Sequence, residues 1–314
     1  MTTTFGLQLP NFSLGVADAD LFEAVADRAV AAEETGFQSV WVMDHFFQLP
    51  PLGGPDQPIL EAYTLLGGLA VRTKRVQLGT LVTGVTYRNP GMLAKMITTL
   101  DIVSKGRAIL GIGAAWYDVE HEGLGFEYPR DKVRLDMLEE AVQICRAMFR
   151  DDHASFSGEH YQVKDARNLP RPIQEGGPRI MIGGGGEKRT LKLVAQYADA
   201  CNVSGGVEMV SHKLDVLRQH CEAVGRDPAE IQNTAMAITI LSESDEQTAS
   251  LKEMVRSAGG EETAAAALIG RVEELPDMVA PYVEAGVDEM ILSLAFGSAD
   301  DVRSVGETLV GHFG

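Results

Sequence analysis

The chain has 314 residues, of which 45% are hydrophobic and 23% charged, and its formal net charge is −18. This length suits one or two domains, and the apolar fraction is sufficient for a large core. The acidic balance argues against nucleic acid and anionic membrane surfaces as partners, because both require a basic face. No apolar stretch reaches membrane-spanning length, so we expect neither partner.

Residues 1–5 carry no basic segment of the kind that opens a signal peptide, so we expect none. The three cysteines, Cys145, Cys201 and Cys221, are odd in number and lack CxxC spacing. We therefore expect buried, reduced thiols in a cytoplasmic protein.

Short apolar runs alternate with amphipathic stretches along the chain, which predicts strands that alternate with helices. The strands are expected at residues 5–12, 39–46, 76–82, 107–114, 180–182, 200–204, 234–241 and 288–295. The helices are expected at residues 20–35, 61–72, 89–103, 130–149, 187–197, 208–224, 245–267, 272–285 and 299–313. A small hairpin around Gly158 is expected at residues 154–163, before the fifth strand.

Alternation of this kind implies parallel pairing through helical crossovers, either in a doubly wound sheet or in a closed barrel. Eight strands favour the (β/α)8 TIM barrel of the α/β class. No repeat, low-complexity tract or linker divides the chain, so we expect a single domain over residues 1–314. Active sites of such barrels gather at the carboxyl ends of the strands, and the candidate residues are therefore those that follow each predicted strand.

The fifth predicted strand runs through four glycines into a helix expected to begin at Glu187. The glycines are Gly183, Gly184, Gly185 and Gly186. Bare backbone N–H groups approach a phosphate closely, and a helix N-terminus adds partial positive charge. Lys188 and Arg189 fall in the predicted first helical turn, where a cation is otherwise unfavourable, and a nearby anion would account for them. The stretch indicates a phosphate cradle, with a plain glycine turn as the alternative.

Asp44 and His45 follow a mainly apolar strand, which places them at the expected barrel mouth. An imidazole there could move a proton near neutral pH, and Asp44 could orient a ring or a cofactor. The alternative is a capping Asp and a packed His.

Two further strand ends have the composition of a pocket wall. Residues 81–90 carry few polar side chains, which suits the flat face of a large ring, although an ordinary strand end fits equally well. Residues 111–116 are small until Trp116, which could wall a pocket or pack in the core.

An acidic cluster follows this strand end, and we interpret it as a solvated loop rather than a metal site. Its members are Asp118, Glu120, His121 and Glu122, whose spacing fits no standard ligand set. The chain also lacks GxSxG, GxxxxGK[ST] and a helix-opening GxGxxG after the first strand. These absences exclude the serine hydrolase, P-loop and dinucleotide-binding interpretations.

Taken together, the motifs resemble the luciferase-like monooxygenase superfamily, and within it the oxidoreductases that use the deazaflavin coenzyme F420. The resemblance runs almost from end to end. Its marks are GFQSVWVMDHF at residues 36–46, VQLGTLVTGVTYRNP at 76–90, GRAILGIGAAWYDVEHEGLGFEYP at 106–129 and RIMIGGGGEKRTLKLVAQYADACN at 179–202. FMN uses the same fold and similar motifs, and is the alternative cofactor.

The resemblance implies a TIM barrel with insertions, one of which covers the mouth. It also implies a non-proline cis peptide between Leu81 and Val82 that supports the cofactor ring, and a cofactor phosphate at the glycine turn. No metal is implied. With the strand ends above, the expected cofactor-binding residues are Asp44, His45, Leu81, Val82, Thr83, Gly113, Ala114, Ala115, Gly183, Gly184, Gly185, Gly186, Glu187, Asn202 and Ser204.

In the related sugar-phosphate dehydrogenases the residue that matches His45 is a catalytic base, so His45 is the expected catalytic residue. Those enzymes carry a Glu after the fourth strand, where this chain has Trp116, and a Trp where this chain has Leu49. The resemblance therefore implies hydride transfer between the deazaflavin C5 and a small organic substrate. It favours a reductase, or a dehydrogenase of less polar substrates, over glucose-6-phosphate dehydrogenation.

Three other functions remain open from the sequence. The first is an FMN-dependent monooxygenase supplied with reduced flavin by a partner reductase, the second a non-catalytic flavin or deazaflavin carrier, and the third another phosphate-binding barrel such as an isomerase. Barrels of this superfamily usually pair, which implies a homodimer, and the apolar helix at residues 65–71 is a candidate contact. The sequence does not identify the substrate.

Overall fold

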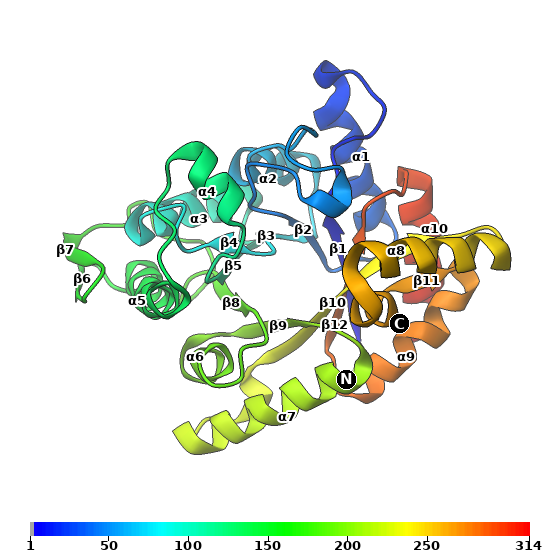
Figure 1. Cartoon of the computed structure of the whole chain (residues 1–314). Helices are drawn as coiled ribbons and strands as arrows, with labels where there is room; N and C mark the ends of the chain where they lie inside the picture. The colour runs from blue at the N-terminus through cyan, green and yellow to red at the C-terminus, as the bar shows by residue number, and fades with distance from the viewer. Residues whose placement is uncertain (1–2) are drawn as a thin grey trace.

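The computed structural model describes residues 3–314 and confirms the TIM barrel. The barrel strands are β1 (Thr4–Leu9), β2 (Ser39–Val42), β3 (Gln77–Thr80), β5 (Ala108–Gly113), β8 (Arg179–Gly183), β9 (Ala200–Ser204), β10 (Gln232–Leu241) and β12 (Glu289–Leu294). They pair in parallel in this order, and β12 pairs with β1 to close the ring seen in Figure 1.

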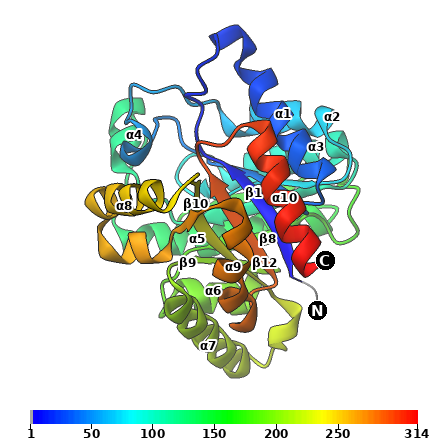
Figure 2. The ribbon, with the colours of Figure 1, turned by 90° about the vertical axis from the view of Figure 1, so that its right-hand side faces the viewer.

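Helices surround the ring on its outside (Figure 1). They are α1 (Leu21–Glu34), α2 (Ala62–Arg72), α3 (Pro90–Ser104), α4 (Asp118–Leu124), α5 (Asp131–Arg150), α6 (Thr190–Tyr197), α7 (Val207–Val224), α8 (Asp245–Ala266), α9 (Leu275–Glu284) and α10 (Ala299–Phe313). Figure 2 shows that α4 and α8 lie toward the carboxyl end of β1, which is the mouth of the barrel.

Alternating side chains divide the core into two parts. On β2, Val40 and Val42 belong to the large apolar layer between strands and helices, whereas Trp41 between them belongs to a separate cluster. Successive strand residues point to opposite faces, so this second cluster fills the barrel interior. Its other buried members are Ile109, Met181, Ala200 and Ile291. Burial on both faces explains the continuous apolar runs in the sequence.

A polar network closes the amino end of the barrel. The Trp41 Nε1–H donates to Ser39 Oγ at 2.6 Å, and the Ser39 hydroxyl in turn donates to Glu289. The Gln232 amide donates to the other Glu289 oxygen at 3.3 Å. Burial raises the pKa of Glu289, which favours the neutral carboxyl. The side chains at the amino end of the barrel interior are therefore bound to one another, and the candidate site residues lie at the opposite end.

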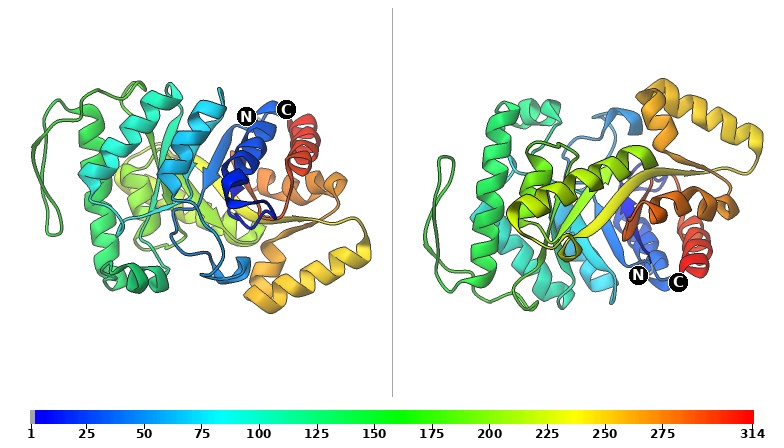
Figure 3. Two further views of the ribbon diagram at one scale, coloured as in Figure 1. Left: turned by 90° about the horizontal axis from the view of Figure 1, so that it is seen from above. Right: turned by 90° about the horizontal axis from the view of Figure 1, so that it is seen from below.

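Two segments project from the barrel on opposite sides (Figure 3). One is the predicted hairpin, formed by β6 (Ala154–Ser157) and β7 (Gln162–Ala166) in antiparallel pairing. The other is α8, which is interrupted at Gly260 (φ 82°, ψ 175°) and leads into β11 (Leu268–Gly270) beside β10. Within residues 3–314, none of the helices combines the length and apolar character needed to cross a bilayer.

Two differences from the predicted elements bear on the site. The strand expected at residues 76–82 ends as β3 at Thr80, and the expected cis peptide between Leu81 and Val82 separates it from a further short strand, β4 (Thr83–Gly84). The helix expected from Glu187 begins at Thr190, because residues 187–189 form a turn. The prediction that Lys188 and Arg189 lie in a first helical turn is therefore wrong.

Candidate active site at the barrel mouth

The parallel ladder brings the strand-end candidates onto one rim. Gly84 of β4 pairs with Gly113 of β5, and Gly183 of β8 pairs with Asn202 of β9. Because all the strands run in one direction, residues that follow them lie at the same end of the barrel. The loop after β2 adds Asp44 and His45 to this rim.

The His45 ring is held at one nitrogen and free at the other. Its Nδ1 lies 2.7 Å from Glu120 Oε1, the His45 side chain is 12% exposed, and the Glu120 side chain is fully buried. In the described part of the chain Nε2 has no hydrogen-bond partner. A carboxylate only accepts, so Glu120 fixes the proton on Nδ1 and leaves Nε2 to exchange a proton with a ligand.

Glu120 binds four donors at once. Its Oε2 accepts from the backbone N–H groups of Phe46 (2.6 Å) and Phe47 (3.2 Å), and Oε1 also accepts from the Tyr87 hydroxyl. Burial alone would raise the pKa of Glu120, but the hydrogen bond and charge of His45 and the Tyr87 hydroxyl outweigh it and hold that pKa below its usual value. An ionised carboxylate therefore orients both the His45 ring and the loop that carries it.

The prediction of an acidic loop is wrong, because all four residues lie in the helix α4, and the prediction that they are solvated is wrong for two of them. Glu120 and His121 are buried in α4, and the His121 Nδ1 lies 2.6 Å from the Tyr117 carbonyl oxygen. Asp118 and Glu122 are exposed, as expected. Tyr117, Glu120 and His121 are spaced three and four residues apart, which is the repeat of one helix face, and this spacing was the available signal.

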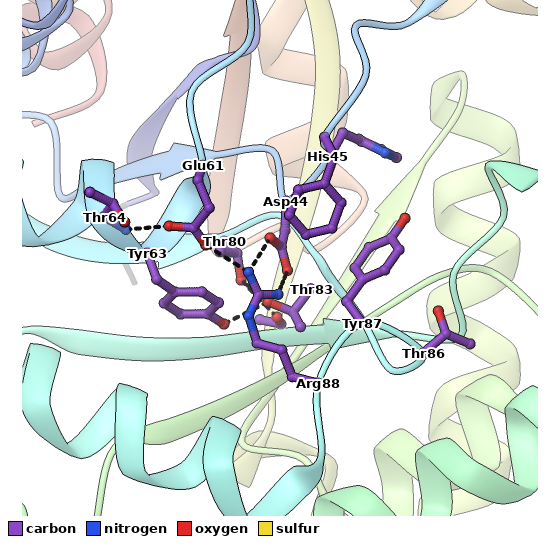
Figure 4. A network of polar contacts seen from close by, with 12 residues as sticks. Asp44, His45, Glu61, Tyr63, Thr64, Thr80, Thr83, Thr86, Tyr87 and Arg88 are labelled. Carbon is purple, nitrogen blue, oxygen red and sulfur yellow. Dashed lines mark hydrogen bonds and ion pairs between the residues drawn. The ribbon is translucent and has the colours of Figure 1, made fainter. Parts of the chain in front are cut away.

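Asp44 points away from His45 into a separate buried network, as Figure 4 shows. Its carboxylate is 1% exposed and binds Arg88 twice, at 2.6 and 3.0 Å. Arg88 also binds Glu61 at 2.7 Å and lies 4.7 Å from the Tyr63 ring centroid. Both Asp44 carboxylate oxygens thus accept hydrogen bonds from Arg88, and they connect the end of β2 to the segment before α3.

The cis peptide gives the mouth an apolar ridge. Leu81 and Val82 are half-buried and pack on the interior cluster, and Gln8 Nε2 donates to the Leu81 carbonyl oxygen at 3.2 Å. A Cβ at either Gly113 or Gly183 would lie 2.8 Å from a Val82 methyl group. These two glycines therefore make room for the Val82 side chain, a packing reason that the glycine pattern alone does not reveal.

Thr83 lies below the ridge rather than on it. The residue is fully buried, and its Oγ1 is 2.6 Å from the Tyr63 hydroxyl and 2.9 Å from Thr80 Oγ1. Figure 4 shows these side chains meeting the Arg88 network. Thr83 thus anchors β4, and its side chain has no open face for a ligand.

The segment after β5 forms part of the rim. Ala114 and Ala115 are half-exposed, and the Ala114 carbonyl oxygen accepts from Arg134 Nε at 2.9 Å. Trp116 is 60% exposed, which excludes the core-tryptophan interpretation. Its ring centroid lies 5.6 Å from that of His45 in an edge-on arrangement, so the indole borders the imidazole at the mouth.

The glycine turn has the features of an anion cradle. Gly184 adopts φ 124° and donates its N–H to the Asn202 carbonyl oxygen at 3.0 Å. Over residues 3–314, the N–H groups of Gly185 and Gly186 make no hydrogen bond. The exposed Ser204 hydroxyl stands at the end of the neighbouring strand β9. The donors available here are two unpaired backbone N–H groups and a hydroxyl, which suit a phosphate.

Charged residues around this turn mostly bind one another. Arg189 pairs with Asp136 at 2.7 Å, and this contact accounts for the cation without a bound anion. The Glu187 carboxylate binds Lys213 at 2.6 Å and His212 at 3.0 Å, and the Lys213 and His212 contacts lower its pKa. The negative charge of Glu187 is therefore offset by Lys213 on α7, which reduces its repulsion of an anion at the glycines.

Asn202 supports the turn from below. It is 7% exposed, and its Nδ2 donates to Thr234 Oγ1 on β10 at 2.9 Å. The side chain is thus used to join β9 to β10, whereas the backbone carbonyl oxygen of Asn202 accepts from the Gly184 N–H.

Comparisons with known proteins agree with this architecture. The family model described as luciferase-like monooxygenase matches residues 3–303. The F420-dependent glucose-6-phosphate dehydrogenase of Kineococcus radiotolerans is 35% identical over 214 residues, covering 67% of this chain and 61% of that protein. The protein of the same name from Rhodococcus hoagii is 30% identical over 302 residues, covering 85% and 86%. The chain thus spans less than two thirds of the length of the first of these relatives.

Solved structures share the fold at low sequence identity. The coenzyme F420-dependent tetrahydromethanopterin reductase from Methanopyrus kandleri superposes with a TM-score of 0.80 at 18% identity, over all of both chains. An F420-dependent secondary alcohol dehydrogenase gives a TM-score of 0.83 at 20% identity, again over all of both chains. From the match over residues 3–303, the chain belongs to the luciferase-like monooxygenase family.

Proposed function

We propose that the protein is a coenzyme F420-dependent oxidoreductase. The observation that carries the proposal is the His45 ring, which is fixed by Glu120 at Nδ1 and free at Nε2. It stands on the same rim as the apolar Leu81–Val82 ridge and the glycine turn. The two relatives named above are both F420-dependent dehydrogenases, which supports this choice of coenzyme.

The chain's residues fit such a coenzyme. Gly185, Gly186 and Ser204 would hold its phosphate, and Leu81 and Val82 would support its ring. When bound, the deazaflavin supplies or accepts hydride at C5. The polar side chains Asp44, Thr83, Glu187 and Asn202, all bound within the protein, would position these groups instead of touching the coenzyme through their side chains. Gly113, Gly183 and Gly184 set the backbone path, and Ala114 and Ala115 leave space at the rim.

His45 Nε2 would transfer the proton that accompanies reduction or oxidation of the substrate. Glu120 keeps the other ring proton on Nδ1 and balances the positive charge when the ring is protonated. Trp116 and Tyr117 border the ring with centroid distances of 5.6 and 5.8 Å, limiting its rotation and its exposure to water. We favour reduction of a small organic substrate, or oxidation of an alcohol, as the reaction.

A side-by-side titration with oxidised F420 and FMN tests the proposal. F420 should bind at least tenfold more tightly, and reduced F420 should pass hydride to an organic acceptor with no oxygen consumption. Tighter binding of FMN, with oxygen uptake by the reduced flavin, would instead identify a monooxygenase that depends on a partner reductase. Coenzyme binding without turnover on any acceptor would identify a carrier.

We further propose one domain, a homodimer and a cytoplasmic location. The pairing of β1 with β12 supports the single domain, since it joins the two ends of the chain. The apolar face expected at residues 65–71 is largely used in the core between the strands and the helices, because Leu65, Leu66 and Leu69 are buried there. Val71, Met92 and Val103 on α2 and α3 are exposed and are the better candidate contact. A light-scattering mass near one 33.9 kDa chain would refute the dimer.

A further inference from the structure

A cavity of about 570 Å³ lies at the mouth beside the carboxyl end of β9. Its walls come from the end of β9 with the start of α7, from the middle of β10 and from the last turns of α8. In Figure 1 the second half of α8 lies next to the start of α7, which encloses the cavity between them. Neither His45, to which the proton transfer is assigned, nor the ridge residues Leu81 and Val82 line this cavity.

The cavity borders the proposed coenzyme site at one end. Ser204, a wall residue, belongs to the proposed phosphate cradle. Met236, another wall residue, packs on the same interior cluster as Leu81 and Val82. A molecule in the cavity would therefore lie next to the proposed phosphate cradle and reach the barrel interior through Met236, rather than occupy a remote site.

The walls are mainly apolar and carry no cation. Met209, Met236 and Ile238 line the cavity together with small residues 265–267 of α8 and its carboxyl end. The only charged wall residues are Glu208 and Glu262, both exposed and acidic. Glu208 lies in the first turn of α7, so the partial positive charge of that helix end already has an anionic partner.

An anionic substrate is therefore disfavoured here. A phosphate monoester carries about −1.5 to −2 charges at pH 7, and Arg or Lys side chains bind it most strongly. The cavity offers two carboxylates instead, in a chain of net charge −18. The same argument disfavours an anionic tail of the coenzyme as the occupant.

We propose that this cavity binds the substrate, and that the substrate is an uncharged, largely apolar small molecule such as a ketone, an enone or a secondary alcohol. The proposal rests on the proposed function above. It separates this chain from the glucose-6-phosphate dehydrogenases to which it is similar, because a sugar phosphate has no cationic partner in the cavity.

Binding of two probes distinguishes the classes. Ligand-observed NMR on the protein saturated with oxidised F420 should show saturable binding of 2-cyclohexen-1-one and none of glucose 6-phosphate. Ala266→Trp, which fills the cavity from α8, should weaken enone binding at least tenfold while the F420 affinity changes less than threefold. Unchanged enone binding in Ala266→Trp would overturn the assignment of the cavity.

A matched pair at Gly206 isolates the charge. A Cβ there meets no atom within 4 Å and the backbone is extended (φ −65°), so a side chain enters the cavity without strain. Gly206→Lys should give about tenfold tighter glucose 6-phosphate binding than Gly206→Met, which adds similar bulk without charge. Binding of glucose 6-phosphate to the wild type, or its reduction of F420, would overturn the substrate class. Failure of F420 itself to bind would refute the proposed function instead.

Discussion

Replacing Glu120 by Gln tests the arrangement on which the proton transfer depends. The carboxylate accepts from His45 and Tyr87 at Oε1 and from two backbone N–H groups at Oε2. A Gln side chain has one accepting oxygen, so its NH2 must face donors on one side. If the NH2 faces His45, the ring adopts the opposite tautomer and Nε2 is protonated in the neutral form. If it faces the backbone, the loop after β2 loses its anchor.

The magnitude follows from the hydrogen bond that is lost. A hydrogen bond to a charged group contributes about 1.5–3 kcal/mol, which is a factor of roughly 10–100 in rate when it acts in the transition state. We therefore expect kcat of Glu120→Gln to fall at least about 10–100-fold. The F420 dissociation constant should change less than threefold, because the glycine turn is untouched.

The assay is the oxidation of F420H2 by an uncharged enone, monitored through the deazaflavin absorbance at several pH values. Coenzyme binding is measured separately. Glu122→Gln is the matched control, since Glu122 is exposed on the same helix and should leave kcat unchanged. The kcat–pH profile should change shape only in Glu120→Gln, an effect that a purely structural role would not produce. A Glu120→Gln enzyme with wild-type kcat and an unaltered pH profile would refute the reasoning.

Three other substitutions test separate parts of the site and fold. His45→Asn should lower kcat about 10²–10⁴-fold with little change in F420 affinity; normal turnover would mean that water supplies the proton, and lost binding would mean that His45 holds the ring. Gly185→Asp should abolish F420 binding with an unchanged circular dichroism spectrum, and more severely than Gly185→Ala, because a Cβ at this position makes only ordinary 3.5 Å contact with Lys213. Glu33→Gln should cost about 1–3 kcal/mol of unfolding free energy above pH ~4.3, measured by urea denaturation, because its carboxylate accepts from three backbone N–H groups. Burial favours the neutral form of Glu33, but those hydrogen bonds, led by the one from Arg75, lower the pKa of its carboxyl in the folded protein. The stability that Glu33 contributes should therefore be lost as the pH falls from the pKa of the unfolded state through the lower pKa of the folded state. Equal acid sensitivity of the variant and the wild type would contradict this.

The fold was predictable because buried parallel strands and amphipathic helices leave local patterns. The last helix, expected at residues 299–313, is α10 at Ala299–Phe313. The hairpin around Gly158 was equally visible, since a glycine separates two short alternating runs. These features depend on residues close together in the sequence, which periodicity and turn chemistry describe. The cis peptide at Leu81–Val82 came from the family resemblance alone, because neither residue has a local preference for it.

The contacts of the site were not predictable, because they join residues distant in sequence. Glu120 binds His45 across 75 positions, and Arg88 binds Asp44 across 44. A carboxylate among four charged or ionisable residues at positions 118–122 looks solvated until its partners are known. In the same way, Gly183 looks like part of a phosphate loop, whereas its missing Cβ is required by Val82 on another strand.

Asp44 and His45 show how one strand end serves two purposes. Adjacent residues point in different directions, and Asp44 enters a buried ion pair with Arg88 while His45 stays at the rim. The Asp44–Arg88 pair fixes the backbone at the end of β2, and the bonds from Glu120 to the following N–H groups fix the next turn. With the backbone held on both sides and Nδ1 bound to Glu120, the imidazole has little rotational freedom, and Nε2 is left without a partner in the described part of the chain. A rigid strand end with one unpaired nitrogen is the arrangement that proton transfer requires, since the ring is already oriented before the substrate binds.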